Sequence, residues 1–503
     1  MKRINLIKSI IFSTTLVLGV SCTNLNEEVL DGVLTNDSAG GTVNTTALLK
    51  SAYEGLREFQ GQGQMFAMDE ISTDALVGPT RGGDWDDNAQ WRQLHTHTWA
   101  PDHGEVRAAW NSLLSNVYNC NLIIENGTGS VVDQAHFLRA FYYFHVVDLF
   151  GQAPYRPAGS SLTDDPLVWS RAEATDIIIK ELEDVVGKLP ARVAGDASIA
   201  NKDAANFLLA KLYLNKAVYK ATAAEGPYTF DAADMTKVVS YVDAISSTLA
   251  PAYWDNFAPS NNTSNEILFS SKNISGSGGN IQSRWRMCQH YNQTPGGWNG
   301  FSTLSDYYDK FDANDARAKH STPQIIADFG NPVGFQVGQQ FEPGGTIKLN
   351  DRNGNLLIFT RELQLITSKE TLETAGIRAE KYIPDVSNLG APENDYVFFR
   401  FSDALLMKAE AIARGGAGSV GTIMTDIATR AGVTPAAADL AGIYDERGRE
   451  LWWEGWRRND MVRFGTFLNA NQLKPYVSAT NYILYPIPAD ALFNANLKQN
   501  PGY

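Results

Sequence analysis

Apolar residues return at helical spacing along much of the chain. In residues 47–59, Leu48, Leu49, Ala52 and Leu56 fall on one face of a helix. The same spacing predicts further helices over residues 110–125, 136–150, 174–189, 204–219, 235–249 and 402–413. The stretch 136–150 is apolar on almost every side, so we expect that helix to be buried by several neighbours.

The arrangement of these helices is predicted by their small residues. Residues 204–219 are rich in alanine and leucine, and small side chains let a neighbouring helix approach closely. We therefore expect paired helices of the tetratricopeptide kind, although no strict repeat period is visible. Residues 250–392 differ: they are rich in Gly, Asn, Ser and Pro, with short apolar runs at 267–269 and 356–359 that read as short strands or extended loops.

Charge and large aromatic residues are most concentrated in residues 445–467. On a helix, Glu446, Glu450 and Glu454 share one face, with arginines within reach and three tryptophans between them. One interpretation makes Glu450 and Glu454 the acid and base of a glycoside hydrolase. We favour the other, a buried ion-pair network on a helix, because such networks also crowd charges without performing chemistry.

The N-terminus is typical of an exported lipoprotein. Lys2 and Arg3 precede an apolar run that is too short to span a bilayer permanently, so residues 1–21 predict a signal peptide. Small residues stand ahead of Cys22, as in a bacterial lipobox, and we expect this thiol to be acylated; ordinary secretion with a free thiol is the alternative. Cys120 and Cys288 are predicted to be buried thiols.

Composition restricts the class of ligand. The chain has 503 residues and a formal net charge of −14, which argues against nucleic acid as the main partner. A hydrophobic content of 44% and an aromatic content of 11% indicate an ordered globular protein. Neutral or weakly charged ligands fit this excess of negative charge better than nucleic acid does.

Several motifs, taken in order along the chain, resemble the SusD/RagB family of Bacteroidetes outer-membrane lipoproteins. They begin at the lipobox-like Cys22 and continue almost to the C-terminus. The motifs are AYEGLR at 52–57, FLRAFYYFHVVDLFG at 137–151, FRFSDALLMKAEA at 399–411, RELWWEGWRRNDMVRFG at 449–465, YPIP at 485–488 and the terminal QNPGY.

This resemblance implies both a fold and a function. It implies a mostly α fold, in which tetratricopeptide-like helical pairs form a scaffold and a loop-rich region with few short strands carries the ligand surface. It also implies a lid that captures oligosaccharides, or less often peptides, for a SusC-like TonB-dependent transporter. No catalysis and no cofactor are implied. Glu27 and Glu28, just after Cys22, are similar to the signal that sends such lipoproteins to the cell exterior.

The expected domain organisation follows from the signal, the composition and the resemblance. Residues 1–21 form the signal peptide, and residues 22–40 form an acylated tether at the outer membrane. Residues 41–250 form the SusD-like N-terminal helical region, and residues 251–503 form the C-terminal region with its loop-rich insert and closing helices.

Two loop regions hold the candidate ligand-binding residues. A sugar ring offers an apolar face and a rim of hydroxyls, so its receptor needs flat aromatic side chains beside hydrogen-bonding groups. In residues 74–101, Trp85 stands beside Arg81 and Asp84 among glycines and aspartates. Trp91 and Trp99 lie in more apolar surroundings, and for them we favour a role in packing the loop.

The second loop spans residues 284–301. Trp298 lies between a glycine and Asn299, Asn292 adds an amide, and Tyr291 adds another aromatic face. In the family that the chain resembles, ligand contacts come from loops in about these two regions, which supports Trp85 and Trp298 by position alone. The predicted ligand-binding residues are Arg81, Asp84, Trp85, Tyr291, Asn292 and Trp298.

The sequence does not support a metal site or a phosphate site. His95, His97 and His103 suggest a metal site, but His95 and His97 have no clear third ligand, so we expect structural histidines. The run GSGG at 276–279 lacks the lysine and the following helix that phosphate binding needs, so no phosphate site is predicted there. The three histidines likewise lead to no predicted metal site.

Overall fold

The computed structural model describes residues 34–35, 42–157, 160–161, 163–277, 279–364 and 372–503. The expected signal peptide, Cys22, Glu27 and Glu28 lie outside these residues, so their proposed roles stay predictions. Among the described residues, no helix is both long enough and apolar enough to cross a bilayer. Cys120 and Cys288 are buried free thiols, as predicted.

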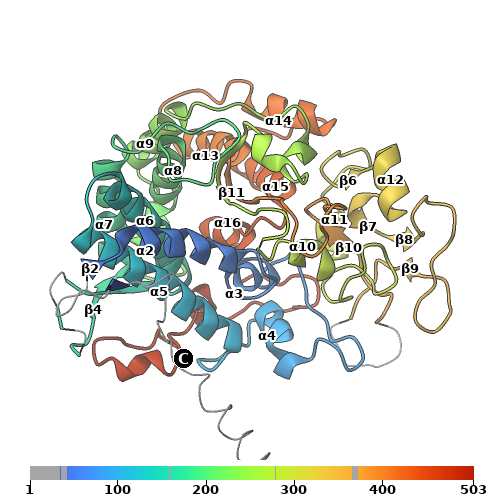
Figure 1. Ribbon diagram of the computed structural model, residues 1–503, viewed down its shortest axis with the longest axis horizontal. Coiled ribbons are helices and arrows are strands. Elements are labelled where there is room, and N and C mark those ends of the chain that lie inside the picture. Colours follow the sequence, from blue (N-terminus) through green and yellow to red (C-terminus); the bar gives the residue numbers. More distant parts are fainter. Residues whose placement is uncertain (1–33, 36–41, 158–159, 162, 278, 365–371) are drawn as a thin grey trace, which may run out of the picture.

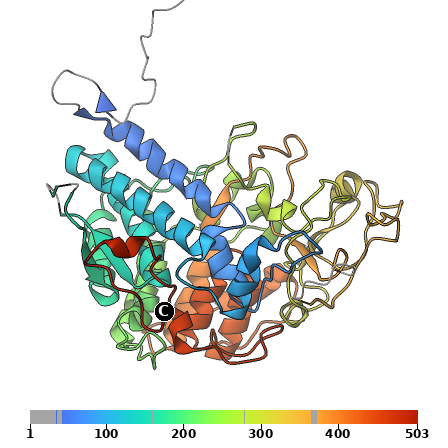
Figure 2. The same cartoon turned by 90° about the horizontal axis from the view of Figure 1, so that it is seen from below.

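The N-terminal half is built from helices that pack on their neighbours in sequence. Figure 1 shows them gathered on the left of the molecule, and Figure 2 shows α2 and α5 running side by side. This confirms the expected mostly α scaffold of helical pairs. The helices are α2 (Thr45–Glu54), α5 (Gly104–Asn126), α6 (Ser130–Leu149), α7 (Arg171–Val185), α8 (Lys202–Tyr219) and α9 (Ala232–Asp243).

Local sequence explains where these helices begin and which faces they bury. The Ser170 hydroxyl accepts a hydrogen bond from the backbone N–H of Glu173, whose carboxylate accepts one from the backbone of Ser170, forming a capping box at the start of α7. Asn201 caps α8 in a similar way, by accepting from the Ala204 N–H. From Phe137 onward, α6 is buried on almost all sides, as its unbroken apolar run predicts.

The strands are few and short, and each belongs to a small antiparallel sheet. β5 (Ile267–Ser271) pairs with β11 (Tyr396–Arg400), and β7 (Val333–Gln336) lies between β10 (Arg378–Glu380) and β6 (Lys319–His320). The other pairs are β1 (Leu34–Thr35) with β2 (Thr42–Val43), β3 (Gln152–Tyr155) with β4 (Leu167–Ser170), and β8 (Gly338–Gln339) with β9 (Ile358–Phe359).

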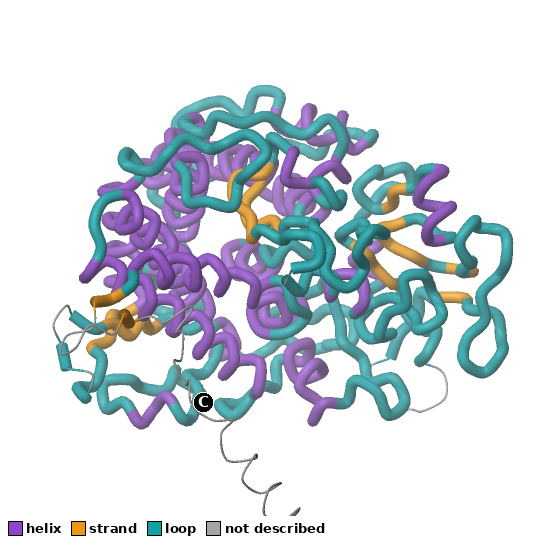
Figure 3. The backbone as a smooth tube through the Cα atoms, in the orientation of Figure 1, coloured by secondary structure: helices purple, strands orange, loops and turns teal. Residues whose placement is uncertain are grey.

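Long loops and short helices fill the remainder of the molecule. Figure 3 shows loops dominating the right side, around β6 to β10, whereas helices dominate the left. This matches the composition shift near residue 250. The additional helices are α3 (Gln64–Phe66), α4 (Gln90–Thr96), α10 (Ser283–Arg286), α11 (Ser305–Tyr308), α12 (Pro323–Phe329), α13 (Phe401–Ala413), α14 (Ile423–Ala431), α15 (Leu440–Glu450) and α16 (Arg457–Arg463).

The charged stretch 445–467 is not one continuous helix, so the prediction was wrong on this point. It forms the end of α15, a turn, and then α16. The turn contains Trp453 and Gly455, whose backbones are left-handed with φ of 57° and 81°. The Trp453 indole N–H donates to the Ala75 carbonyl oxygen over 3.2 Å, so the turn directs this side chain into the core.

The carboxylates of this stretch form the ion-pair network that we favoured. Glu450 is fully buried and accepts from Arg400 over 2.9 Å and from Arg317 over 3.3 Å, and Arg430 pairs with it as well. Glu454 accepts from Arg400 over 2.7 Å. Burial alone would raise the pKa of Glu450, but the surrounding guanidinium groups hold it well below its usual range. These contacts join α15 to β11 and to the loop region.

Candidate functional site

The two predicted ligand loops lie side by side, although about two hundred residues separate them in the sequence. Val77 and Ser302 exchange backbone hydrogen bonds of 2.9 and 3.0 Å. Next to this bridge, the backbone amides of Arg81 and Asp84 each donate to the other residue's carbonyl oxygen, over 2.8 and 3.0 Å. The bridge and the turn together fix the position of residues 81–85 against residues 298–302.

Trp85 and Trp298 are in contact. The Trp85 indole N–H donates to the Trp298 carbonyl oxygen over 2.9 Å, and both side chains are half-buried. The Trp85 ring packs on Phe301 with centroids 4.9 Å apart. A Cβ atom added to Gly300 would lie 2.4 Å from the Trp85 ring, so the fit requires glycine there. Trp85 therefore anchors the loop and also leaves part of its ring at the surface.

The structure places the Arg81 guanidinium beneath this surface. Its Nε atom donates to the Gly300 carbonyl oxygen over 2.7 Å, and an Nη atom donates to the Ser302 hydroxyl over 2.8 Å. The remaining N–H groups reach the carbonyl oxygens of Leu372 and Ala375. Burial lowers the pKa of Arg81, and the nearby charge of Arg378 lowers it further. The Arg81 guanidinium thus supports the site from below, and Arg81 is also among the residues that line the cavity described below.

Tyr291 and Asp84 form one wall of the site. The Tyr291 hydroxyl donates to the Asp84 carboxylate over 2.9 Å, which adds a further contact between the two loops. Burial, together with this carboxylate, raises the pKa of Tyr291 to about 12. The side-chain amide of Asn292 is exposed and donates to the Asn350 carbonyl oxygen over 2.8 Å.

A third segment, between β8 and β10, adds residues that sequence reasoning missed. Arg352 lies over the Tyr291 ring, 4.3 Å from its centroid, and its Nε atom is 3.2 Å from the Glu373 carboxylate. Its Nη1 atom is 3.9 Å from Asp84. The sequence DRNGN at 351–355 predicts an exposed turn, but nothing in it indicates that the turn meets the two tryptophan loops.

The first and third of these segments line a cavity of about 550 Å³, and the second segment contacts them through Tyr291. Its lining is mostly polar: two glycines leave the backbone accessible, and both charge signs are present. This volume lies within the range of about 300–1,000 Å³ that is typical of ligand pockets. The lining residues are Arg81, Gly82, Gly83, Asp84, Arg352, Asn353 and Glu373.

His290 lies behind the cavity and contacts Glu373, one of the lining residues. Its Nε2 atom lies 2.8 Å from the Glu373 carboxylate, and its Nδ1 atom accepts the Asn292 backbone N–H over 3.1 Å. This pattern assigns the neutral tautomer with the proton on Nε2. Burial lowers the pKa of His290, against the opposing effect of Glu373. Burial alone would raise the pKa of Glu373, but hydrogen bonds from Arg352 and His290 hold it below its usual value.

The other aromatic and histidine residues of the first loop are part of the core. Trp91 and Trp99 are buried, as we expected from their apolar surroundings. His95, His97 and His103 are also buried, and a ring nitrogen of each contacts a backbone carbonyl oxygen. These contacts give the histidines a structural role.

The chemistry of the cavity suits a hydroxyl-rich ligand. Asp84, Glu373 and Arg352 provide charged hydrogen-bonding groups around one opening, and Tyr291 provides an aromatic face beside them. Asp84 and Glu373 share one guanidinium between them, so neither carboxylate is isolated.

Comparison with known proteins gives matches over most of the chain. A family model described as the SusD family matches residues 250–503, and one described as starch-binding associating with outer membrane matches residues 30–214. The starch-binding protein SusD of Bacteroides thetaiotaomicron is 27% identical to this chain over 492 residues, which cover 87% of this chain and 85% of that protein.

Solved structures share the fold. A SusD superfamily protein from Parabacteroides distasonis superposes with a TM-score of 0.70 at 20% identity, covering 91% of this chain and 98% of its own. A laminarin-binding SusD-like protein gives a TM-score of 0.69 at 20% identity and covers 91% of this chain and 99% of its own. At these identities the likeness concerns the fold alone.

Proposed function

Because this chain belongs to the SusD family, we propose that it is a glycan-binding lipoprotein of the outer membrane. In this proposal Cys22 carries the lipid, and the body faces the cell exterior. The protein captures oligosaccharides and acts as the lid of a partner TonB-dependent transporter of the SusC type. The family assignment inferred from the sequence motifs is confirmed; the anchor, the orientation and the transporter belong to the proposal.

One observation carries the glycan-binding proposal. Asp84, Arg352 and Glu373 line the cavity, and the Tyr291 ring contacts two of them, Asp84 and Arg352. Trp85 and Trp298 are half-buried in the same pair of loops. Aromatic faces beside charged hydrogen-bonding groups match the two surfaces of a sugar ring. The starch-binding and laminarin-binding relatives support the same class of ligand.

We propose binding without cleavage. The carboxylates that suggested hydrolysis, Glu450 and Glu454, are buried within pairs to Arg400 and other cations. A hydrolase needs one carboxylic acid with a raised pKa beside a carboxylate, but the arginines lower the pKa of Glu450. A structural ion-pair network therefore explains Glu450 and Glu454 better than hydrolysis does.

The test is a glycan array, followed by calorimetry on the oligosaccharides that bind. The expected result is saturable binding that Tyr291→Ala weakens by about tenfold, equivalent to about 1.4 kcal/mol. Trp169→Ala is the matched control, because Trp169 is also a half-buried aromatic residue but stacks on Tyr155 in the β3–β4 pair, outside the cavity. This control should bind glycan as the unmodified protein does.

Three results would contradict the proposal. Equal affinity of the Tyr291→Ala variant and the unmodified protein would place the glycan elsewhere. Sustained release of shortened, labelled oligosaccharide would show an enzyme. Peptides retained in a pull-down, with no glycan retained on the array, would favour the peptide-capturing lid of the same architecture.

A further inference from the structure

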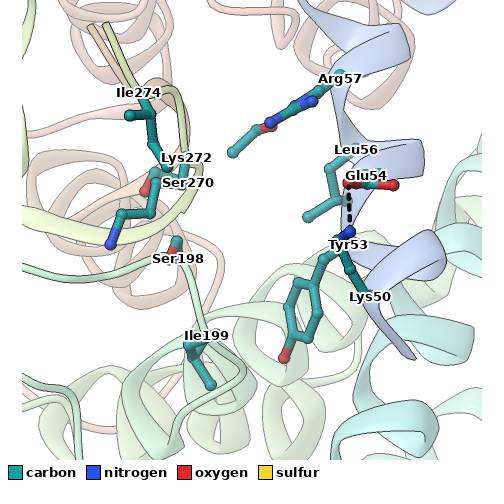
Figure 4. A pocket seen from close by; sticks show the side chains of 11 residues that line it. Lys50, Tyr53, Glu54, Leu56, Arg57, Ser198, Ile199, Ser270, Lys272 and Ile274 are labelled. Atoms are coloured by element: carbon teal, nitrogen blue, oxygen red, sulfur yellow. Dashed lines mark ion pairs between the residues drawn. The ribbon is translucent and has the colours of Figure 1, made fainter. Parts of the chain in front are cut away.

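A second cavity lies between helix α2 and the end of strand β5. Its volume is about 270 Å³, close to the lower limit of about 300 Å³ for small-molecule pockets. Figure 4 shows Tyr53, Leu56 and Arg57 on one side and Ile274 and other residues on the opposite side. It shares no lining residue with the cavity at Arg352, so it is a separate site.

The charged side chains of this cavity are mostly cations. Lys50, Arg57 and Lys272 line it together with a single carboxylate, Glu54, in a chain whose formal net charge is −14. Lys50 lies 3.9 Å from Glu54, and Lys272 pairs with Asp196 over 2.7 Å. Among the described residues, no carboxylate pairs with the Arg57 guanidinium, which extends into the cavity in Figure 4.

Exposed aliphatic side chains lie in the cavity lining and on loops connected to it. Ile199 and Ile274 line it and are 43% and 57% exposed, and Val193 and Val386 are 63% and 58% exposed on adjoining loops. The Lys272–Asp196 ion pair joins the loop of Val193 and Ile199 to the end of β5. We call these four side chains, with the cavity and Arg57, the Ile274 face.

Backbone contacts hold the far side of the Ile274 face in place. The Gly276 N–H donates to the Ala391 carbonyl oxygen over 2.8 Å, which joins the turn after Ile274 to the loop that carries Val386. Large exposed aliphatic residues grouped around a hollow are typical of interaction sites, whereas single ones scattered over a surface are ordinary.

We propose that the Ile274 face is a docking surface for a partner protein that presents an Asp or Glu side chain between large apolar side chains. The partner carboxylate pairs with Arg57, and its apolar neighbours cover Ile199 and Ile274. Charge complementarity favours this occupant, because the cavity offers a guanidinium without an ion pair and a mainly apolar wall. The proposal does not depend on glycan binding, since the two sites have no residue in common.

The experiment selects short random peptides on a phage display library against the whole purified chain. Counter-selection on the Arg57→Glu variant removes peptides that bind elsewhere. The expected peptides contain an acidic residue flanked by apolar residues. By fluorescence anisotropy, Arg57→Glu and Ile274→Asp should each weaken their binding by at least about tenfold, because a desolvated charge contact is lost or an apolar contact becomes charged.

Two control variants make the same changes of charge outside the Ile274 face. Ile347 is 59% exposed and lies in the loop region after β8, so Ile347→Asp introduces the same charge outside the Ile274 face. Lys237→Glu reverses an exposed cation on α9. Both variants should bind the selected peptides with the affinity of the unmodified chain. Circular dichroism would verify that all four variants are folded.

Specific outcomes would overturn the proposal. Selected peptides without any acidic residue would show that Arg57 does not determine the partner. An equal loss of affinity in the control variants would show that the effect is not local. Concentration-dependent dimerisation in analytical ultracentrifugation, abolished by Ile274→Asp, would identify the occupant as a second copy of this chain. The proposal would also be contradicted if no selected peptide bound the unmodified chain more tightly than the Arg57→Glu variant.

Discussion

The indole N–H of Trp85 donates a hydrogen bond to the carbonyl oxygen of Trp298 over 2.9 Å. This single contact joins two loops that the sequence separates by more than two hundred residues. The donor is the side chain of Trp85, whereas the acceptor is the backbone of Trp298. Replacing Trp85 therefore removes this hydrogen bond, and replacing Trp298 does not. Trp85 supports the loop through its ring and its N–H group, whereas the hydrogen bond uses only the backbone of Trp298.

The first prediction separates these two roles. Trp85→Ala should lower the free energy of unfolding by about 2 kcal/mol, roughly half of what removing a fully buried tryptophan costs, because the ring packs on Phe301. Trp298→Ala should lower glycan affinity with a smaller loss of stability. Urea titration and calorimetry on both variants measure the two effects, and an identical loss of stability would contradict the distinction.

The second prediction concerns the glycine under the Trp85 ring. Gly300→Ala should displace the ring, because the new Cβ atom would lie 2.4 Å from it, and overpacking of this kind costs about 1–3 kcal/mol. Gly83→Ala is the control: Gly83 lies in the cavity lining near Trp85, yet a Cβ there meets no atom within 4 Å. Thermal denaturation and tryptophan fluorescence should change only for Gly300→Ala.

The third prediction is a pH dependence at His290. The folded state favours the neutral imidazole, since burial lowers its pKa from 6.5 and Nδ1 accepts the Asn292 N–H. As the pH falls below about 6.5, the unfolded chain takes up the proton first, so the stability contributed by His290 is lost. Glu373, Arg352 and Arg378 face this ring, and the lowered pKa of Glu373 keeps it ionised in this range.

His290→Gln tests this dependence, because glutamine donates to Glu373 without titrating near neutral pH. The difference in melting temperature between the unmodified protein and this variant should shrink between about pH 7.5 and pH 5.5. A difference that is equal at both pH values would show that the histidine contributes only packing.

The fourth prediction concerns a buried carboxyl group that destabilises the folded state as the pH rises, whereas His290 does so as the pH falls. Burial raises the pKa of Glu380 to about 8, although its oxygen accepts from Gln289 over 2.6 Å and from Gln336 over 2.7 Å. The unfolded chain loses this proton near the ordinary pKa of 4.5, so the folded state is penalised increasingly as the pH rises from 4.5 to 8. Glu380→Gln should therefore stabilise the protein more at pH 8 than at pH 4.5, as measured by denaturant titration.

The fifth prediction concerns the ion-pair network. Glu450→Ala should lower the free energy of unfolding by about 3–5 kcal/mol, because it leaves Arg400 and Arg430 with fewer buried counter-charges. Asp309→Ala removes an exposed partner of Arg361 and should change stability by less than about 1 kcal/mol. Glycan preference should be unchanged in the Glu450→Ala protein that folds, and an altered preference would place Glu450 in function after all.

Local patterns were enough to predict most of the helical scaffold. The apolar period of residues 47–59, 110–125 and 136–150 corresponds to helices in the structure, because each of these faces must be buried whatever packs against it. The prediction failed at 445–467, where Trp453 and Gly455 take left-handed backbones and turn the chain. The spacing of apolar residues does not indicate where a turn interrupts the helix and buries an indole.

The loops show the limit of the same reasoning. Residue types alone identified Asp84, Trp85, Tyr291, Asn292 and Trp298, which the structure brings to one place. They also suggested that Arg81 would face the ligand, but four backbone and hydroxyl acceptors surround its guanidinium inside the protein. An arginine in a glycine-rich loop looks the same in sequence whether it points outward or inward.

The sequence by itself determined the helical scaffold, the family, the buried thiols and the two loops rich in aromatic residues. Only the tertiary structure decided that Arg352 and Glu373 complete the cavity and that Arg81 supports it from below. The physical reason is the range of the interactions. Helix periodicity and capping act over a few neighbouring residues, whereas the cavity depends on contacts between segments that only folding brings together.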